Sequence, residues 1–491
     1  MDRTATPAVQ EYPSVELTDF AQESGRQAPP PRSGQPTPLP SSGTFSAASS
    51  QAALRGALDD GPNVQELAPV DGGVQAWTFC ACAFILEMMI WGYCFSYGIF
   101  QDYYTTHAPF DRASSIAISA VGTTAIGLQY AEALIFSCFF SRYPDYMMLS
   151  MWCGLGLSVA SIFASSFATQ VWQLILLQGV AFGVAGGLLY APVLKLLPEW
   201  FSARRGLAGG IIFAGGGVGG ELSRFIFPFV WSILLDKLGL QWTLRLWALL
   251  TAVFCGFALL GIHPRLPVPK FTGGRPRPRF IPLQLGFASS PLFWSVSLTL
   301  LLQGFSYFPV SLYIASFARR LSSPLTATVV LSVFNSSAVA GQVILGHLSD
   351  RFPYPWVMFC SALGSSVAAF LLWGLASGPT PLYLFAIIFG ALSGGFSSTW
   401  THAAFECARG QPEHTGIAWG GTAVFKGVSA VGGPILSSVL LDLGGGRALA
   451  GPFGRQGFGA VEVFVGACAL ATALGSLAIA AARRRAVVRF S

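Results

Sequence analysis

The composition of this 491-residue chain excludes an ordinary water-soluble globular protein. Hydrophobic residues make up 53% of the chain and charged residues only 10%, whereas soluble domains carry roughly 25% charged residues. A small net charge of +6 and a mean hydropathy of +0.58 are typical of a polytopic membrane protein, for which we expect no nucleic-acid partner. The nine cysteines lack metal-ligand spacing, so we expect no metal, no cofactor and no disulfide framework.

Residues 1–73 differ from the rest of the chain because they are rich in proline, serine and glycine and have no apolar periodicity. This composition predicts a disordered tail, which we place in the cytoplasm. The tail has no apolar core followed by a small-residue cleavage site, so it does not read as a signal peptide.

From Val74 onward, apolar runs of about 20 residues recur, and each is long enough to cross roughly 30 Å of hydrocarbon as a helix. The twelve runs lie near 76–100, 114–140, 147–166, 170–192, 206–235, 243–262, 292–317, 326–348, 355–377, 381–405, 415–441 and 459–482. They form two sets of six, within 74–262 and 291–482, separated by a basic loop at 263–290 and followed by a tail at 483–491. This pattern predicts an all-α membrane protein with twelve transmembrane helices in two six-helix bundles.

The orientation follows from lysine and arginine in the loops. With the N-terminus inside, the cytoplasmic loops and the C-terminal tail hold fifteen basic residues and the outer loops hold six. An even number of spans then places both termini in the cytoplasm. The plasma membrane is the expected location, and the vacuole is the alternative.

The fifth run begins after Arg204 and Arg205 and is an apolar stretch that is almost half glycine. Small residues let helices approach closely in a membrane, and these glycines cover more than one face of the helix. We therefore expect close contact with two neighbours, either in static packing or as a helix that moves during a transport cycle. A G-x-G-x-x-G pattern in this stretch lies inside a helix at membrane depth, so it does not predict a dinucleotide site.

Three segments resemble known transporter signatures. DGGVQAW at 71–77 and WFSARRGLAGG at 200–210 resemble the two signature segments of the monocarboxylate porter family, which belongs to the major facilitator superfamily. GHLSDR at 346–351 is similar to the superfamily's loop motif. The resemblance, which favours the fungal branch, implies the major facilitator fold and transport across a membrane.

The chain also departs from this family. Animal proton-coupled members carry a lysine late in the first span and an Asp/Arg pair in the eighth, where this chain has Tyr97, Ala338 and Gln342. The resemblance therefore does not imply lactate or pyruvate as the substrate. Fungal relatives include vitamin carriers and exporters encoded beside secondary-metabolite pathways.

Ionisable side chains at membrane depth are costly and are functional candidates by default. Glu87 in the first run and Glu132 in the second are the candidates for proton coupling, and a structural ion pair with Lys426 is the alternative for either. The substrate-binding candidates are Lys426, Arg224, Tyr97 and Asn335. For Arg224 the alternative is an ion pair with Glu221 on the same helix. Aromatic residues could add an amphipathic cavity wall, namely Trp91, Tyr93, Tyr97, Tyr307 and Trp400.

Charged residues at the cytoplasmic ends of the fifth and eighth runs predict a gate, because salt bridges there would close the inner side. Setting the topology alone is the alternative role for these charges. The gating candidates are Asp71, Arg204, Arg205, Asp350 and Arg351.

We interpret the chain as a secondary active transporter of a small organic acid or amphipathic metabolite, coupled to protons, with export of a fungal secondary metabolite as one form. Its expected partners are this organic anion or metabolite, the proton and the lipid bilayer. The P-loop pattern is absent, so ATP is not the expected energy source, and the chain shows no catalytic set typical of an enzyme. The alternatives are an uptake permease for a monocarboxylate or vitamin, and a non-transporting nutrient receptor with the same fold.

Overall fold

The structure is a computed structural model in which contacts divide the chain into residues 1–66 and residues 67–491. The described residues are 67–221, 227–268, 277–280, 286–409, 411–443, 453–454 and 457–488. Nearly all of the predicted tail at 1–73 lies outside them. Within the described ranges all regular structure is helical, which confirms the all-α fold class.

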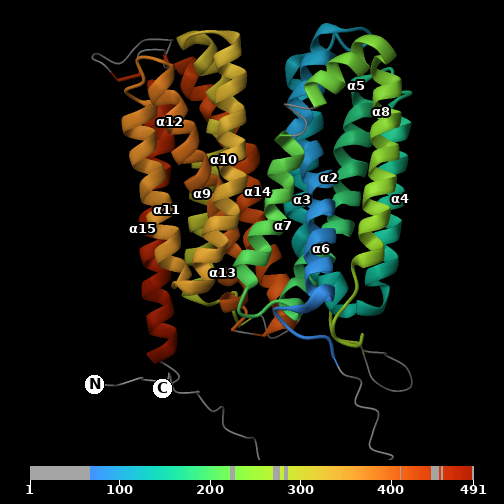
Figure 1. The fold of residues 1–491 in the computed structure, drawn as a ribbon, viewed down its shortest axis with the longest axis vertical. Coiled ribbons are helices and arrows are strands. Elements are labelled where there is room, and N and C mark those ends of the chain that lie inside the picture. The colour runs from blue at the N-terminus through green and yellow to red at the C-terminus, as the bar shows by residue number, and fades with distance from the viewer. Residues whose placement is uncertain are drawn as a thin grey trace, which may run out of the picture. The chain divides into compact units, whose positions relative to one another are not determined.

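The helices of the first predicted half follow the apolar runs closely (Figure 1). They are α2 (Gly73–Thr106), α3 (Ser115–Arg142), α4 (Met147–Ser165), α5 (Val171–Leu174), α6 (Phe182–Trp200), α7 (Arg205–Glu221) and α8 (Phe227–Gly261). A π-helical segment, η2 (Ile175–Ala181), joins α5 and α6 into one span. The helix α8 is kinked at Gly239, where a φ of 76° requires a left-handed backbone that glycine adopts without strain.

The helices of the second predicted half also follow the apolar runs. They are α9 (Pro291–Leu321), α10 (Pro324–Arg351), α11 (Tyr354–Val367), α12 (Pro379–Phe389), α13 (Trp400–Cys407), α14 (Pro412–Leu443) and α15 (Gly459–Val488). The π-helix η4 (Ala368–Trp373) extends α11, and the short segments η5 (Gly390–Gly394) and η6 (Phe396–Thr399) connect α12 to α13.

Eleven helical spans within the described residues are long and apolar enough to cross a membrane. The remaining predicted run, 206–235, covers α7 and the start of α8, with residues 222–226 outside the description. The twelve predicted runs therefore fit the observed helices. The helix α15 continues to Val488, into the predicted tail at 483–491. In this extension the Nε of Arg483 lies 2.6 Å from Oε1 of Glu406 in α13.

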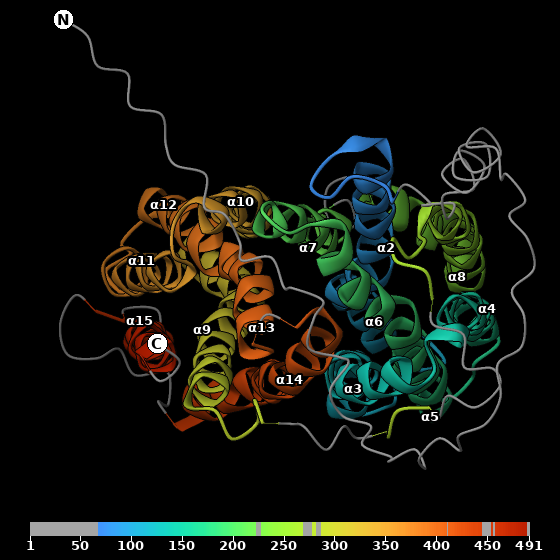
Figure 2. The ribbon, with the colours of Figure 1, turned by 90° about the horizontal axis from the view of Figure 1, so that it is seen from below.

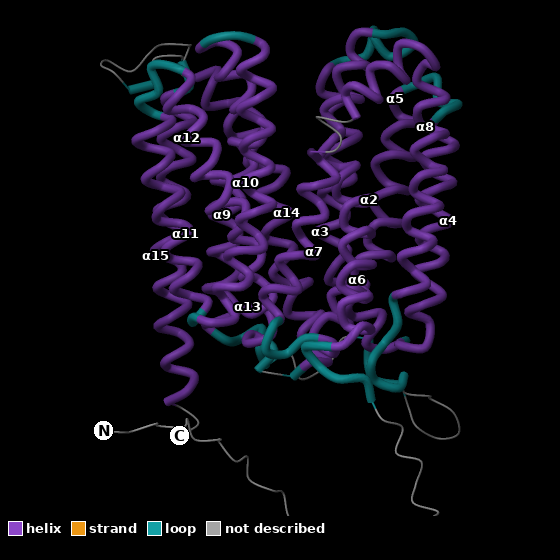
Figure 3. The backbone as a smooth tube through the Cα atoms, viewed as in Figure 1, coloured by secondary structure: helices purple, strands orange, loops and turns teal. Residues whose placement is uncertain are grey.

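Helices α2 to α8 and α9 to α15 lie in two groups that meet along two helix pairs (Figures 1 and 3). Figure 2 shows α7 beside α10 and α3 beside α14, and both pairs are in extensive contact. On α14, Gly420 allows this approach, because a Cβ there would lie 2.7 Å from the backbone oxygen of Ala133 in α3. Any movement of one group against the other must therefore change these two interfaces.

The glycines of α7 pack against two different helices. A Cβ at Gly210 would collide with the backbone oxygen of Gln342 in α10, and a Cβ at Gly219 would collide with the backbone of Met88 in α2. Backbone atoms cannot move aside as a flexible side chain can, so both interfaces need a residue without a side chain. The prediction that α7 contacts two neighbours closely is confirmed.

Candidate functional site

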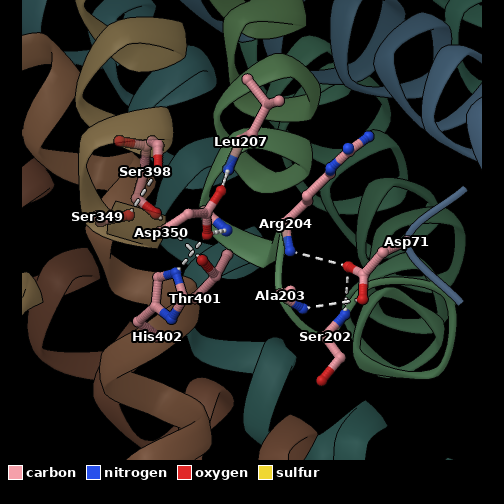
Figure 4. A network of polar contacts seen from close by, with 12 residues as sticks. Asp71, Ser202, Ala203, Arg204, Leu207, Ser349, Asp350, Ser398, Thr401 and His402 are labelled. Atoms are coloured by element: carbon pink, nitrogen blue, oxygen red, sulfur yellow. Dashed lines mark hydrogen bonds and ion pairs between the residues drawn. The ribbon is translucent and has the colours of Figure 1, made fainter. Parts of the chain in front are cut away.

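The turn that leads into α7 is held by the carboxylate of Asp71, just before α2 (Figure 4). Its Oδ1 accepts hydrogen bonds from the backbone N–H groups of Ser202 and Arg204, each at 2.8 Å, and Oδ2 accepts one from Ala203 at 2.9 Å. The Asp71 N–H donates to the Trp200 carbonyl at 3.0 Å. The two segments that carry the family resemblance are thus in direct contact.

The first turn of α7 is capped from the other group of helices by Asp350, at the end of α10. Its Oδ1 accepts from the Gly206 N–H at 2.6 Å and its Oδ2 from the Leu207 N–H at 2.8 Å. The first N–H groups of a helix have no intrahelical partner and lie at the positive end of the helix dipole, so a carboxylate stabilises them. His402 of α13 completes the contact with Nε2 at 2.8 Å from Oδ1 (Figure 4).

The contacts at this end differ from the predicted salt bridges, while the gating role itself stays a prediction. The ion pairs found in the described ranges are Arg277–Asp145, His402–Asp350 and Arg483–Glu406. Arg204 and Arg351 have exposed side chains and take part in none of these pairs. The reason is geometric, since the short Asp350 side chain reaches the start of α7, where backbone N–H groups are the nearest donors.

Arg205 joins the two groups of helices in another way. Its side chain is buried, and its guanidinium carbon lies 3.6 Å from the centroid of the Phe405 ring in α13. Its Nε has no hydrogen-bond partner within the described ranges. A guanidinium over an aromatic face is attracted by the ring quadrupole, and the attraction is larger where water is excluded. Arg205 therefore stabilises the contact between α7 and α13 through stacking.

Glu87 lies buried in α2 at the contact with the glycine-rich α7. A Cβ at Gly215 would lie 3.1 Å from the Cβ of Glu87, so the absence of a side chain at position 215 makes room for the acid. The hydroxyl of Tyr190 in α6 donates a hydrogen bond to the Glu87 carboxylate. Oε2 of Glu87 has no hydrogen-bond partner in the part of the chain that the structure describes. One oxygen is thus held and the other is free to take a proton.

Glu132 of α3 occupies a comparable place beside α6. It is buried against Gly187, where an added Cβ would collide with the carboxylate, and its Oε1 has no hydrogen-bond partner among the described residues. The neighbouring Gln129 donates from Nε2 to the sulfur of Cys94 at 3.3 Å. Both predicted proton-coupling acids are therefore buried next to α6, and neither belongs to an ion pair found in the described ranges.

Lys426 is buried in α14, with 3% of its surface exposed. Its ammonium group donates a hydrogen bond to the amide oxygen of Gln303 in α9 and lies 5.5 Å from the centroid of the Phe308 ring. Gln303 is itself fixed, because its Nε2 donates to the Ser393 carbonyl at 2.8 Å. The predicted alternative, an ion pair with Glu87 or Glu132, is absent from the described part of the chain.

The other three substrate-binding candidates are not brought together with Lys426 by any contact described for them. The hydroxyl of Tyr97 donates to the Ile118 carbonyl of α3 at 2.6 Å, so this tyrosine fastens α2 to α3. Asn335 is half-buried in α10. Arg224 lies outside the described residues, as does the side chain of its predicted partner Glu221.

Five aromatic rings form a continuous set, which we call the aromatic ladder. Its members, in order of contact, are Tyr130, Trp91, Tyr190, Trp419 and Trp400. Sequence reasoning singled out Trp91 and Trp400 but missed the other three, because an aromatic residue in an apolar run usually indicates packing alone. The glycine at position 427 was the available signal, since a Cβ there would lie 2.6 Å from the Cβ of Tyr130.

The fold and these contacts agree with a comparison against known families. Residues 79–434 match the family model described as Major Facilitator Superfamily. The chain belongs to the major facilitator superfamily. Members of this superfamily are multi-pass membrane transporters and are generally not enzymes, so the chain is a membrane transporter.

Curated relatives of this superfamily member cover most of its length. It is 29% identical to an MFS-type transporter of Gibberella zeae, over 81% of this chain and 86% of that protein. It is 28% identical to the aspyridones efflux protein of Emericella nidulans, over 78% of this chain and 76% of that protein. It is 26% identical to the agnestins efflux protein of Paecilomyces divaricatus, over 74% of this chain and 80% of that protein.

Proposed function

We propose that this chain exports an organic anion or acidic amphipathic metabolite in exchange for, or together with, protons. The observation that carries the proposal is the environment of Lys426. Its ammonium group is buried, and the partners described for it are an amide oxygen and an aromatic face. A buried cation is costly unless an anion compensates it, so an anionic substrate group is the natural ligand.

The proton-coupling role falls to Glu87, with Glu132 as the second candidate. Each is a buried carboxylate with one oxygen for which the described residues supply no hydrogen-bond partner. An acid in such a place binds and releases a proton as the site is alternately covered and opened to water. The hydrogen bond from Tyr190 gives Glu87 a contact that changes with its protonation, because a neutral carboxylic acid is a weaker acceptor.

The gating role is assigned to the capped start of α7. We take residues 74–262 and 291–482 as two bundles that rock against each other about the loop at 263–290. The caps from Asp71 and Asp350 hold α7 from both bundles at the end that carries most of the loop arginines. The positive-inside rule makes that end cytoplasmic, so the described conformation is closed toward the cytoplasm.

The direction of transport and the membrane rest on the relatives. Several of them are named as efflux proteins, which supports export across the plasma membrane with both termini in the cytoplasm. The contact between Asp71 and the 200–210 segment supports membership of the monocarboxylate porter family. That resemblance also favours the second candidate function, uptake of a monocarboxylate or vitamin, which differs in direction and not in site.

The test uses purified protein in vesicles with labelled naphthalenesulfonate. This organic anion stays charged at all working pH values, so it does not leak across the bilayer as a neutral acid. We expect a pH gradient to drive its accumulation, and a protonophore to abolish that accumulation. Accumulation that occurs only when the proton gradient is directed inward would favour uptake. Naphthalenesulfonate movement equal to that of protein-free vesicles would contradict anion transport and leave the receptor alternative.

A further inference from the structure

The aromatic ladder crosses the boundary between the two groups of helices. Trp91, Tyr130 and Tyr190 come from α2, α3 and α6, whereas Trp419 and Trp400 come from α14 and α13. The ring centroids of Trp91 lie 4.8 Å from Tyr130 and 5.9 Å from Tyr190. Those of Trp419 and Trp400 are 4.1 Å apart and stacked.

The boundary falls between Tyr190 and Trp419, whose centroids are 6.0 Å apart at 70°. This is the ladder contact that joins one group to the other, so it is the one that separates when the groups rock apart. All five rings are buried in the described conformation. Separation at this point therefore uncovers two aromatic surfaces that face each other and have lost their mutual contact.

Each of these surfaces also carries an unused hydrogen-bond donor. The indole N–H groups of Trp91 and Trp419 are buried and have no hydrogen-bond partner among the described residues, whereas that of Trp400 donates to the Thr422 hydroxyl at 2.7 Å. A buried indole N–H usually finds a partner. Two unpartnered donors along the ladder favour a ligand that brings acceptor oxygens with its ring.

The aromatic ladder and the buried ammonium group of Lys426 meet along one face of α14. Trp419, Thr422 and Lys426 are spaced by three and then four residues, so they share one face of α14. The seven-residue separation between Trp419 and Lys426 corresponds to about 10 Å along the helix axis. Tyr130 lies beside position 427, which brings the ladder of the first group to the level of Lys426.

We infer that the gap opening between Tyr190 and Trp419 binds the planar, conjugated part of the substrate, with its acidic group directed toward Lys426. This inference rests on the proposed function and adds the substrate class, an acid that carries a fused or extended aromatic ring with oxygen substituents. Aromatic rings prefer offset or edge-on contact at 4.5–7 Å, a geometry that a flat conjugated ring satisfies and a saturated ring does not.

The test compares two anions that differ only in aromaticity, naphthalenesulfonate and its saturated decalin analogue. Their Kd values are measured on the purified full chain by equilibrium binding. The wild type is expected to bind the aromatic anion at least tenfold more tightly. Trp419→Leu is expected to remove that preference while leaving the Kd of the saturated anion within twofold, and Trp419→Phe is expected to keep most of it.

The matched control is Trp152→Leu, since Trp152 lies exposed on α4, and it is expected to keep the wild-type preference. If Trp419→Leu does not fold, Tyr190→Leu removes the opposite face and is expected to give the same loss. Equal binding of both anions to the wild type would overturn the inference and leave the proposed anion transport standing. A preference retained in Trp419→Leu or in Tyr190→Leu would overturn it as well. Binding of neither anion would contradict the proposed function itself.

Discussion

Asp350→Asn should loosen the closed end of the transporter. The Asp350 carboxylate accepts from the backbone N–H groups of Gly206 and Leu207 at 2.6 and 2.8 Å and contacts His402. Asparagine keeps the shape but offers one acceptor oxygen and no charge. At least one charge-assisted hydrogen bond is then lost, about 1.5–3 kcal/mol, together with about 0.3–1 kcal/mol of interaction with the helix dipole.

The sum, about 2–4 kcal/mol, corresponds to a shift of roughly one and a half to three powers of ten in the equilibrium between closed and open conformations. Ser349 reports this shift, because it is 5% exposed and packs against Gly206. The assay introduces Ser349→Cys in a background whose nine native cysteines are replaced. The rate of reaction with a polar maleimide is then measured in permeabilised membranes.

We expect the thiol at position 349 to react at least tenfold faster when Asp350→Asn is added. The matched control is Asp145→Asn, which removes an ion pair with Arg277 that does not join α7 to α10. It should change the rate less than twofold, because partly exposed pairs contribute about 0–1 kcal/mol. Equal reaction rates with Asp and Asn at position 350 would refute the role of the cap in closure.

Three other variants test other parts of the account. Gly219→Leu should abolish transport or folding, because the added side chain would meet the backbone of α2. The control Gly98→Leu should be tolerated, since no atom lies within 4 Å of the added Cβ. Similar activity of the two variants would contradict tight packing at α7. Glu87→Gln should abolish accumulation driven by a pH gradient but preserve anion exchange, and retained uphill transport would move the coupling role to Glu132. Deleting residues 1–60 should leave transport per molecule at the surface unchanged, and a folded but inactive truncation would show that the tail takes part in transport.

The helices could be predicted from the sequence because hydrocarbon leaves the backbone no other hydrogen-bond partners. Apolar run length therefore located α2, α9 and α14, although α2 extends to Thr106, beyond the predicted boundary at 100. The two-sided packing of α7 could also be predicted, since glycine in a lipid-embedded helix mainly allows a neighbouring helix to approach closely. These features depend on local sequence and on the solvent.

The partners of the charged residues could not be predicted in the same way. Helical spacing shows which face a residue lies on, but not which helix lies opposite. The sequence offered Glu87 and Glu132 as partners of Lys426, whereas the observed partner, Gln303, lies 123 positions away along the chain. In the same way, basic side chains were the expected partners of Asp350, and the observed donors at α7 are backbone N–H groups that no sequence pattern displays.

The central claim is that Lys426 holds the substrate anion, and the KM for naphthalenesulfonate exchange in vesicles tests it most directly. We predict that Lys426→Gln raises the KM at least tenfold with the same amount of protein in the membrane, and that Lys426→Arg restores it only in part, because a guanidinium differs in shape from an ammonium group. The matched control, Lys195→Gln, removes a lysine that donates to the Phe140 carbonyl at 2.6 Å near the end of α6, and it should leave the KM within twofold. An unchanged KM in well-folded Lys426→Gln would contradict the account.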